Sequence, residues 1–319
     1  MNSLRADLSI AVGGLNLETP VVIASGVWPY DPVLWSPERL EGVGALCTKA
    51  VSLQPREGNR GVRVWETPCG MLNSIGLQNS GVRGFLKEYL PIAGKSGIPF
   101  LVNLVMESER EVRENLSILR ESGDAIPAVE LNISCPNADC DGMAWGISPE
   151  SAAQAAAIAR SEWKGPLWVK LTPQAPDLPA VAKAVESEGA DALVCGNTWL
   201  GMAMDLKRKQ PVFRRVTAGL SGPAVFPLAL RTVWQVCGAV SIPVVGCGGV
   251  SRWEDAAAMI LAGASAVEVG SSLFADFDLP RKISEGLADY LADAEIPNLA
   301  GLVGLGRKEK EGGRPWAQD

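Results

Sequence analysis

The stretch Ala128-Val129-Glu130-Leu131-Asn132-Ile133-Ser134-Cys135-Pro136-Asn137 begins as an apolar run and ends in polar residues. A short apolar run bounded by turn-forming residues predicts a buried β-strand, here over Ala128–Ile133. At its exit the chain places a thiol, Cys135, between two carboxamides, Asn132 and Asn137. We therefore expect this strand to end at a chemically active face of the fold.

The same pattern recurs along the chain, with amphipathic or alanine-rich segments between the apolar runs. The other expected strands are Val21–Ala24, Ala45–Val51, Phe100–Val105, Leu167–Leu171, Ala192–Cys195, Pro243–Gly246 and Ala266–Val269. Eight strands alternating with helices predict a single (β/α)8 TIM-barrel domain spanning residues 1–319. A doubly wound sheet is the alternative, and it is less favoured because no G-x-G-x-x-G motif follows the first strand.

Three features outside the strands refine this expectation. Residues 6–19, with Gly13-Gly14 at their centre, predict a hairpin that covers the bottom of the barrel. Three connections are longer than a barrel needs, and we expect them to form functional loops on the top face: residues 52–97, 134–147 and 199–223. We expect the charged, glycine-rich segment 307–319 to be loosely ordered or used at an interface.

Two helix starts carry recognisable capping patterns. Ser148-Pro149 predicts an N-cap followed by proline in the first turn of a helix. Ser251 and Glu254 have the spacing of a capping box, which predicts a helix over residues 252–261. Gly263 is expected to end that helix, since glycine commonly follows the last helical residue.

Composition argues against several classes of partner. The formal net charge is −7 and the chain has no extended basic block, so nucleic acid and anionic membrane surfaces are not expected. The N-terminus lacks a basic segment followed by an apolar one, and no apolar run is long enough to span a bilayer. These patterns predict a soluble, cytoplasmic protein.

Cysteine and histidine usage restricts the possible chemistry. The 7 cysteines are scattered and form no C-x-x-C pair, which argues against a disulfide framework and against a zinc or iron–sulfur site in this chain. The chain has no histidine. Ser-His and Cys-His catalysis and histidine-based metal sites are thereby excluded, and we expect no metal.

Polar residues or glycines stand at the end of every expected strand. They are Ser25-Gly26, Thr48-Lys49, Asn103, Asn132, Lys170-Leu171-Thr172, Asn197-Thr198, Gly248-Gly249 and Gly270-Ser271-Ser272. Barrel enzymes place their chemistry at this C-terminal face. One such residue is ordinarily a turn former, but eight together predict a functional face.

The glycines after the last two strands suit an anion. Gly248-Gly249 and Gly270-Ser271-Ser272 leave backbone N–H groups accessible, and Gly219–Pro223 adds a third loop before a helix. Ordinary tight turns are the alternative. A phosphate site here predicts a phosphorylated cofactor such as FMN, with Lys170 near the flavin N1–C2=O edge. The alternative for Lys170 is an ion pair with a carboxylate such as Glu130.

The opposite side of the pocket combines one cation with several amides. Lys49 suits a carboxylate, and amides suit a ring made of N–H and C=O groups. The expected substrate pocket is lined by Lys49, Asn132, Asn137, Asn197, Thr198 and the segment Asn73-Ser74-Ile75-Gly76-Leu77-Gln78-Asn79.

Cys135 is the expected general base. The ordinary pKa of a thiol, about 8.5, is near enough to neutral for proton transfer. An inert buried thiol is the alternative, but Cys135 lies in the loop that leaves the fourth strand, stiffened by Pro136. Cys140, in the same loop, is the weaker candidate.

These motifs resemble those of the dihydroorotate dehydrogenase family. The runs Asn132–Asn137, Asn73–Asn79, Asn197-Thr198 and Gly248-Gly249 occur in the family's order, and the similarity extends from about Leu8 to Gly304. A cysteine base in place of serine, without an N-terminal membrane-binding helix, resembles the soluble class 1 enzymes. The stretch from Cys135 to Glu150 resembles class 1B, whose members ultimately reduce NAD.

The resemblance implies oxidation of (S)-dihydroorotate to orotate in pyrimidine biosynthesis. Cys135 would take the C5 proton while hydride passes from C6 to N5 of FMN. The family's FMN contacts fall on Ser25, Lys49, Ala50, Asn103, Asn132, Lys170, Gly222, Gly248, Gly249, Gly270 and Ser271. Its substrate contacts fall on Lys49, Asn73, Ser74, Ile75, Gly76, Leu77, Asn132, Asn197 and Thr198.

The resemblance also implies a partner. Class 1B enzymes pass electrons to NAD through a separate subunit that carries FAD and a [2Fe–2S] cluster, in a heterotetramer around a homodimeric core. This chain has no cysteine cluster of its own. It departs from the family at Val27-Trp28, at Gly196, where an aliphatic residue usually lies beside the flavin, and at Trp199.

Three other functions stay open on sequence alone. One is a class 1A-like homodimer that uses fumarate. Another is a dihydropyrimidine-type oxidoreductase acting on uracil-like rings, whose substrate lacks the carboxylate. The last is a flavin- or phosphate-binding barrel without turnover.

Overall fold

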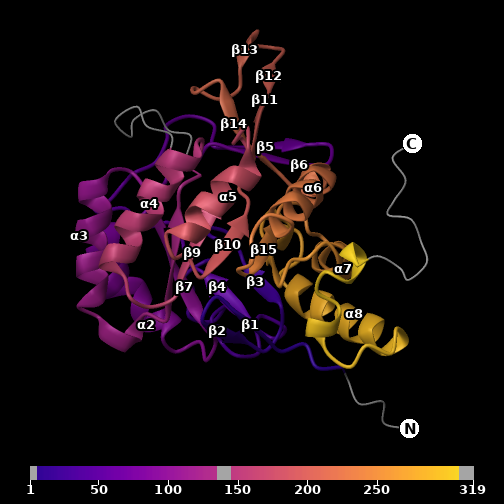
Figure 1. Ribbon diagram of the computed structural model, residues 1–319. Coiled ribbons are helices and arrows are strands. Elements are labelled where there is room, and N and C mark those ends of the chain that lie inside the picture. Colours follow the sequence, from indigo (N-terminus) through magenta and orange to yellow (C-terminus); the bar gives the residue numbers. More distant parts are fainter. Residues whose placement is uncertain (1–5, 135–144, 309–319) are drawn as a thin grey trace.

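Eight parallel strands close into a barrel in the order β10-β15-β16-β3-β4-β7-β8-β9 (Figure 1). The computed structural model describes residues 6–134 and 145–308. The barrel strands are β3 (Val21–Ile23), β4 (Ala45–Cys47), β7 (Phe100–Val105), β8 (Ala128–Asn132), β9 (Leu167–Leu171), β10 (Ala192–Cys195), β15 (Val244–Cys247) and β16 (Ala266–Val269). The predicted (β/α)8 barrel is confirmed, and the doubly wound sheet is not.

One strand is much shorter than expected. The predicted strand Ala45–Val51 ends at Cys47, and Val51 forms only an isolated bridge to Leu104. The apolar run misled the prediction because regular strand pairing stops after Cys47, and the backbone N–H of Lys49 donates to the Tyr30 hydroxyl instead. Lys49 thus lies beyond the end of the strand, where it lines the cavity at the top face.

Helices form the outer layer around the barrel (Figure 1). The larger ones are α3 (Glu109–Arg120), α4 (Pro149–Glu162), α5 (Leu178–Ser187), α6 (Phe226–Cys237), α7 (Trp253–Leu261) and α8 (Leu279–Asp293). Shorter helical segments are α1 (Gly81–Gly84), η1 (Phe85–Tyr89), α2 (Leu90–Ala93), η2 (Gly123–Ala125), η3 (Pro223–Val225), η4 (Ser271–Phe274), η5 (Leu299–Gly301) and η6 (Leu305–Arg307). No helix in the two described ranges is long and apolar enough to cross a bilayer.

The two predicted helix starts have different outcomes. Ser148 caps α4 by accepting a hydrogen bond from the Ser151 N–H, as expected. The capping box at Ser251 is wrong, because α7 begins at Trp253 after an N-cap at Arg252. There Asp255, not Glu254, accepts hydrogen bonds from the backbone and the hydroxyl of Ser251, each at 2.9 Å.

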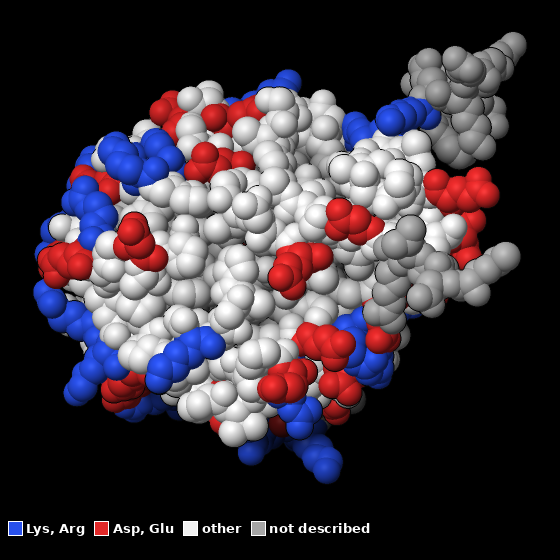
Figure 2. All heavy atoms as spheres, turned by 90° about the horizontal axis from the view of Figure 1, so that it is seen from below, with Lys and Arg blue, Asp and Glu red and all other residues white. Residues whose placement is uncertain are grey.

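The predicted N-terminal hairpin is confirmed and closes the bottom of the barrel. Strands β1 (Ile10–Val12) and β2 (Leu15–Leu17) pack their buried residues against the lower barrel interior, including Trp168. The Trp168 indole donates to the Gly13 carbonyl at 3.1 Å. A Cβ on Gly13 would lie 2.5 Å from Trp168 Nε1, so the turn requires glycine. Seen from below, acidic and basic side chains are interspersed over this face (Figure 2).

Trp168→Phe is expected to lower the free energy of unfolding by about 1–2 kcal/mol, because it leaves the buried Gly13 carbonyl without a donor. Urea denaturation measures this change. The control is Trp234→Phe, whose side chain is 41% exposed and whose effect should stay within about 0.5 kcal/mol. Equal effects of the two substitutions would contradict the role given to the Trp168 hydrogen bond.

Two of the three long connections fold into a sheet above the barrel. Strands β5 (Val64–Thr67), β6 (Gly70–Asn73), β11 (Trp199–Met202) and β14 (Thr217–Ser221) pair in the order β11-β14-β6-β5, and we call this the top sheet. A small hairpin, β12 (Met204–Asp205) and β13 (Gln210–Pro211), extends it (Figure 1). Most of the remaining long connection, residues 134–147, lies outside the described residues, as do residues 309–319.

Candidate active site

A cavity of about 650 Å³ lies between the C-terminal ends of the barrel strands and the top sheet. This volume is in the range of cofactor and substrate sites. Most of the residues predicted from sequence line it: Ser25, Lys49, Ala50, Asn73, Ser74, Ile75, Gly76, Leu77, Asn132, Lys170, Asn197, Thr198, Gly248, Gly270 and Ser271. The structure therefore brings together residues at or just after the C-terminal ends of seven barrel strands, and residues of one long connection.

Gln78 and Asn79, predicted to line the substrate pocket, do not: Gln78 accepts from Arg63 and Asn79 donates to Ser52. Four of the residues predicted for the cofactor lie behind this lining. Asn103 is fully buried and donates to Glu130. Gly222 and Gly249 pack against backbone, at Gly70 and Phe226 respectively, and Gly196 lies against Pro173. These four residues therefore support the wall of the cavity from behind. The predicted base Cys135, together with Asn137 and Cys140, lies outside the described residues.

A hydroxyl that sequence reasoning missed fixes two of the amides. Ser134 donates from its hydroxyl to Asn132 Oδ1 at 2.5 Å and from its backbone at 3.1 Å. Asn197 in turn donates to the Ser134 hydroxyl, and its own Oδ1 accepts from the Thr198 N–H at 2.7 Å. The network holds both amides in place before any ligand binds. In the sequence, only the position of Ser134 next to Cys135 could have indicated this role of its hydroxyl.

Lys49 presents its ammonium at the pocket wall. A Cβ on Gly26 would lie 2.9 Å from Lys49 Nζ, which shows how closely the amine approaches that loop. Burial lowers the pKa of Lys49, and the nearby Arg63 guanidinium lowers it further. Both effects are relieved by an anion, so the site favours a ligand that carries a carboxylate.

A buried group of charges lies inside the barrel below the pocket. Lys170 donates to Glu268 and lies 3.6 Å from Glu130 Oε1. The alternative in which Lys170 pairs with a carboxylate therefore holds, and its nearer partner is Glu268, which sequence reasoning missed. Among the described residues, Cys47, Glu130 and Glu268 are close enough to share a metal, but the Lys170 ammonium already supplies the cation there.

One end of the cavity combines a glycine turn with a helix N-terminus. Gly248 has φ +130°, and a Cβ there would lie 2.8 Å from the Ala229 Cβ. The N-terminus of α6 lies directly behind, since a Cβ on Gly249 would come within 2.6 Å of the Phe226 N atom. Backbone amides of a glycine turn beside a helix N-terminus suit an anionic group. The donor set therefore fits a phosphorylated cofactor.

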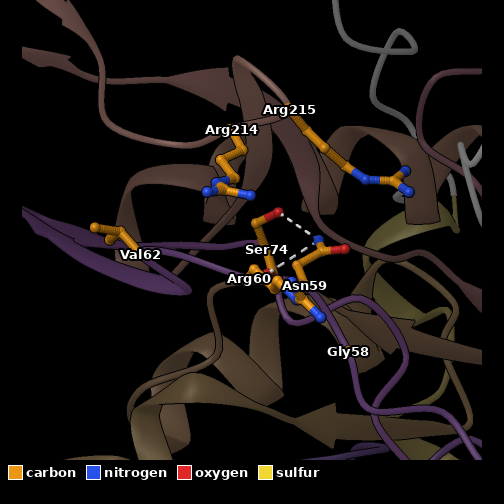
Figure 3. A pocket seen from close by; sticks show the side chains of 7 residues that line it. All are labelled: Gly58, Asn59, Arg60, Val62, Ser74, Arg214 and Arg215. Carbon is orange, nitrogen blue, oxygen red and sulfur yellow. Dashed lines mark hydrogen bonds between the residues drawn. The ribbon is translucent and has the colours of Figure 1, made fainter.

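A second, smaller cavity of about 280 Å³ adjoins the mouth of the first (Figure 3). Arg214 and Arg215 project over it from the segment before β14, and Arg60 lies beside it. Asn59 donates to the Ser74 carbonyl at 3.2 Å and to its hydroxyl at 2.9 Å. Because Ser74, Asn59 and Arg215 line both cavities, these cations raise the positive potential beside the larger one, which favours an anionic ligand.

Sequence reasoning found Asn73 and the loop at Gly219 but missed five other residues that the top sheet contributes. They are Val64, Met71, Leu200, Thr217 and Ala218. No signal in the sequence pairs these strands, because β6 and β14 are far apart along the chain and their burial is only partial.

A closed barrel with such a cavity at the C-terminal ends of its strands defines a (β/α)8-barrel enzyme. The family model of dihydroorotate dehydrogenase matches residues 7–291. The chain belongs to the dihydroorotate dehydrogenase family.

Three curated proteins are similar to this chain over almost its whole length. A protein of Trichlorobacter lovleyi is 43% identical over 304 residues, covering 94% of this chain and 99% of the relative. Proteins of Geobacter sp. strain M21 and Bacteroides thetaiotaomicron are 41% and 40% identical, each covering 94% of this chain and 98% of the relative. All three are named dihydroorotate dehydrogenase B (NAD(+)), catalytic subunit.

A solved structure agrees with the fold. The dihydroorotate dehydrogenase of Eimeria tenella, in complex with ferulenol, matches with a TM-score of 0.78. The match covers 95% of this chain and 89% of that one at 21% sequence identity. At this identity the likeness shows the fold alone.

Proposed function

We propose that this chain is the catalytic subunit of an NAD-linked dihydroorotate dehydrogenase, folded as one barrel domain, which oxidises (S)-dihydroorotate to orotate in pyrimidine biosynthesis. The observation that carries the proposal is the cavity that combines Lys49 with the fixed amides Asn132 and Asn197. The names of the relatives support the same reaction.

FMN is the proposed cofactor, and when bound it supplies the acceptor for the hydride. The phosphate would lie at Gly248, Gly249, Gly270 and Ser271, against the N-terminus of α6. Ser25, Ala50 and Lys170 would line the rest of the flavin site. Asn103, Gly196 and Gly222 would support this wall from behind.

On the substrate side, Lys49 would bind the carboxylate of dihydroorotate. Asn132, Asn197 and Thr198 would hold the N–H and C=O groups of the ring, with the segment Asn73–Leu77 and Asn137 completing the site. Cys135 would accept the proton from C5 as hydride leaves C6. The loss of a proton and a hydride from neighbouring carbons leaves the double bond of orotate.

The proposal includes a partner subunit that carries FAD and a [2Fe–2S] cluster and passes electrons to NAD, in a heterotetramer around a homodimeric core. The phrase "catalytic subunit" in the relatives' names supports a partner. The location proposed for this complex is the cytoplasm, and fractionation of the source cells tests it.

Adding dihydroorotate to the purified chain under anaerobic conditions is expected to bleach the flavin absorbance, because hydride enters the oxidised ring. Dihydrouracil, which lacks the carboxylate, is the control and should bleach it far more slowly. A chain that binds FMN without bleaching would be a binding barrel without turnover. Equal bleaching by the two compounds would favour a dihydropyrimidine-type enzyme.

Turnover with acceptors separates the two classes of dihydroorotate dehydrogenase. The isolated chain should turn over poorly with both fumarate and NAD, and NAD reduction should appear when the partner subunit is added. Rapid turnover of the isolated chain with fumarate would instead identify a class 1A-like enzyme.

A further inference from the structure

Lys170 is enclosed by two carboxylates from other barrel strands. The side chains of Glu130 on β8 and Glu268 on β16 are fully buried, and that of Lys170 on β9 is 5% exposed. Lys170 also lines the cofactor cavity, whereas the glutamates lie below it. The cluster therefore connects the closed interior of the barrel with the flavin side of the pocket.

The charges of this cluster do not balance if every group is ionised. Two carboxylates face one ammonium, and the thiols nearby stay neutral because burial raises the pKa of Cys47 and of Cys247. A net negative charge in a closed interior is costly, so one carboxyl keeps its proton. The groups that face this proton are Glu130, Glu268, Lys170, Cys47, Cys247 and the amide of Asn103.

The hydrogen bonds indicate which carboxyl is protonated. Glu130 accepts from the Asn103 amide and from the Cys47 thiol at 3.2 Å, so its anion is stabilised. Burial alone would raise the pKa of Glu130, but Lys170 and these donors hold it below its usual value. Burial and the charge of Glu130 raise the pKa of Glu268 to about 8, and the hydrogen bond that Lys170 donates to Glu268 offsets them only in part. The proton therefore belongs to Glu268 at neutral pH.

We propose that Glu268 is a positioning residue: with Glu130 it holds the Lys170 ammonium and keeps one exchangeable proton beneath the cofactor pocket, and it thereby sets the reduction potential of the bound flavin. The proposal has two parts. The part on the reduction potential, called the redox half, rests on the proposed function because it requires FMN in the pocket. The part that places a proton on Glu268, called the proton-holding half, does not.

The physical link is the charge that Lys170 presents to the flavin. Reduction adds negative charge to the ring, which the ammonium stabilises. When Glu268 is ionised it offsets that ammonium, so reduction becomes less favourable unless Glu268 takes up a proton at the same time. Reduction by two electrons would then consume one proton at the flavin and, above about pH 8, a second at Glu268.

Potentiometric titration of the FMN-loaded chain from pH 6 to 9 tests the redox half. The wild-type potential should fall more steeply with pH above about 8, and Glu268→Gln should remove this extra slope. At pH 6 the two proteins should agree. At pH 9 reduction of the variant should be favoured by about tenfold, or about 30 mV for a two-electron couple.

The matched control is Glu285→Gln, an exposed carboxylate paired with Arg281 on α8, which should leave the slope unchanged. If the reduction potentials of wild type and Glu268→Gln change with pH by the same slope over the whole range, the redox half is overturned. If Glu268→Gln does not fold, the wild type decides alone, because a single uniform slope from pH 6 to 9 contradicts the proposal.

Unfolding of the flavin-free chain tests the proton-holding half. Between the ordinary glutamate pKa and about 8, the folded state holds the Glu268 proton and the unfolded chain does not. The folding equilibrium should therefore weaken as pH rises, by up to tenfold or about 1.4 kcal/mol per pH unit. Glu268→Gln should lack this contribution, while the raised pKa of Glu107 affects both proteins equally.

The two measurements separate the possible failures. Identical pH slopes of unfolding in wild type and Glu268→Gln would overturn the proton-holding half. A wild-type chain that takes up no FMN would refute the proposed function and the redox half together, and the unfolding comparison would still decide where the proton resides.

Discussion

Replacing Cys135 with alanine is expected to slow reduction of the bound flavin by dihydroorotate by about 10²-fold or more, which is the contribution of a general base. The chain has no histidine that could substitute for the thiol. FMN should stay bound, because most of the residues proposed to hold it lie on other strands. Anaerobic stopped-flow absorbance measures the rate, and the flavin content of the purified variant measures binding.

Cys140→Ala is the matched control for this experiment, since Cys140 lies in the same segment of the sequence. It should change the rate by less than about threefold, because Cys140 has no proposed role in the proton transfer. In the wild type the rate should rise with pH through the range in which a thiol ionises, and Cys135→Ala should lose that rise. Unchanged kinetics in Cys135→Ala would refute the base assignment.

Lys49→Ala should lower kcat/KM for dihydroorotate by roughly 30- to 150-fold, the effect of losing a charged hydrogen bond of about 2–3 kcal/mol. The reason is the environment of Lys49, where burial and Arg63 favour the binding of an anion. Most of the loss should appear in KM, because the carboxylate is bound equally in the ground state and the transition state. Steady-state kinetics with an artificial acceptor measures both parameters.

Two comparisons make the Lys49 prediction specific. The exposed Lys183 on α5 gives the control variant Lys183→Ala, which should behave as wild type. Dihydrouracil has no carboxylate, so its slow reaction should not become slower in Lys49→Ala. A large loss with dihydrouracil as well would mean that Lys49 supports the flavin or the fold and does not select the substrate.

The barrel strands were predictable because a strand that is buried on both faces has a mostly apolar sequence. Phe100–Val105, Leu167–Leu171 and Ala266–Val269 are apolar apart from one polar residue in each, and the structure has the same bounds. Buried parallel strands give such runs, and the polar residues that follow them mark the C-terminal face. The lining of the cavity followed from that rule together with the family motifs.

The top sheet and Glu268 were not predictable in this way. The strands of the top sheet are short and partly exposed, and they gain their stability from partners far along the chain. Glu268 was hidden inside the run Ala266-Val267-Glu268-Val269, where the apolar neighbours predict a strand and say nothing of the charge. Alternation of side chains along the strand was the available signal, since it places Glu268 on the same face as Gly270.

The top sheet has a consequence for how the enzyme comes into being. Asn73 on β6 donates to the Gly219 carbonyl on β14, a residue 146 positions later, and the barrel closes only when β16 pairs with β3. During synthesis the chain therefore lacks the complete top sheet until β14 has been made, and lacks a closed barrel until β16 has been made. Contacts of such long sequence separation form slowly. Loading of the cofactor should thus be a step that follows synthesis, and a truncated chain lacking β16 should capture none.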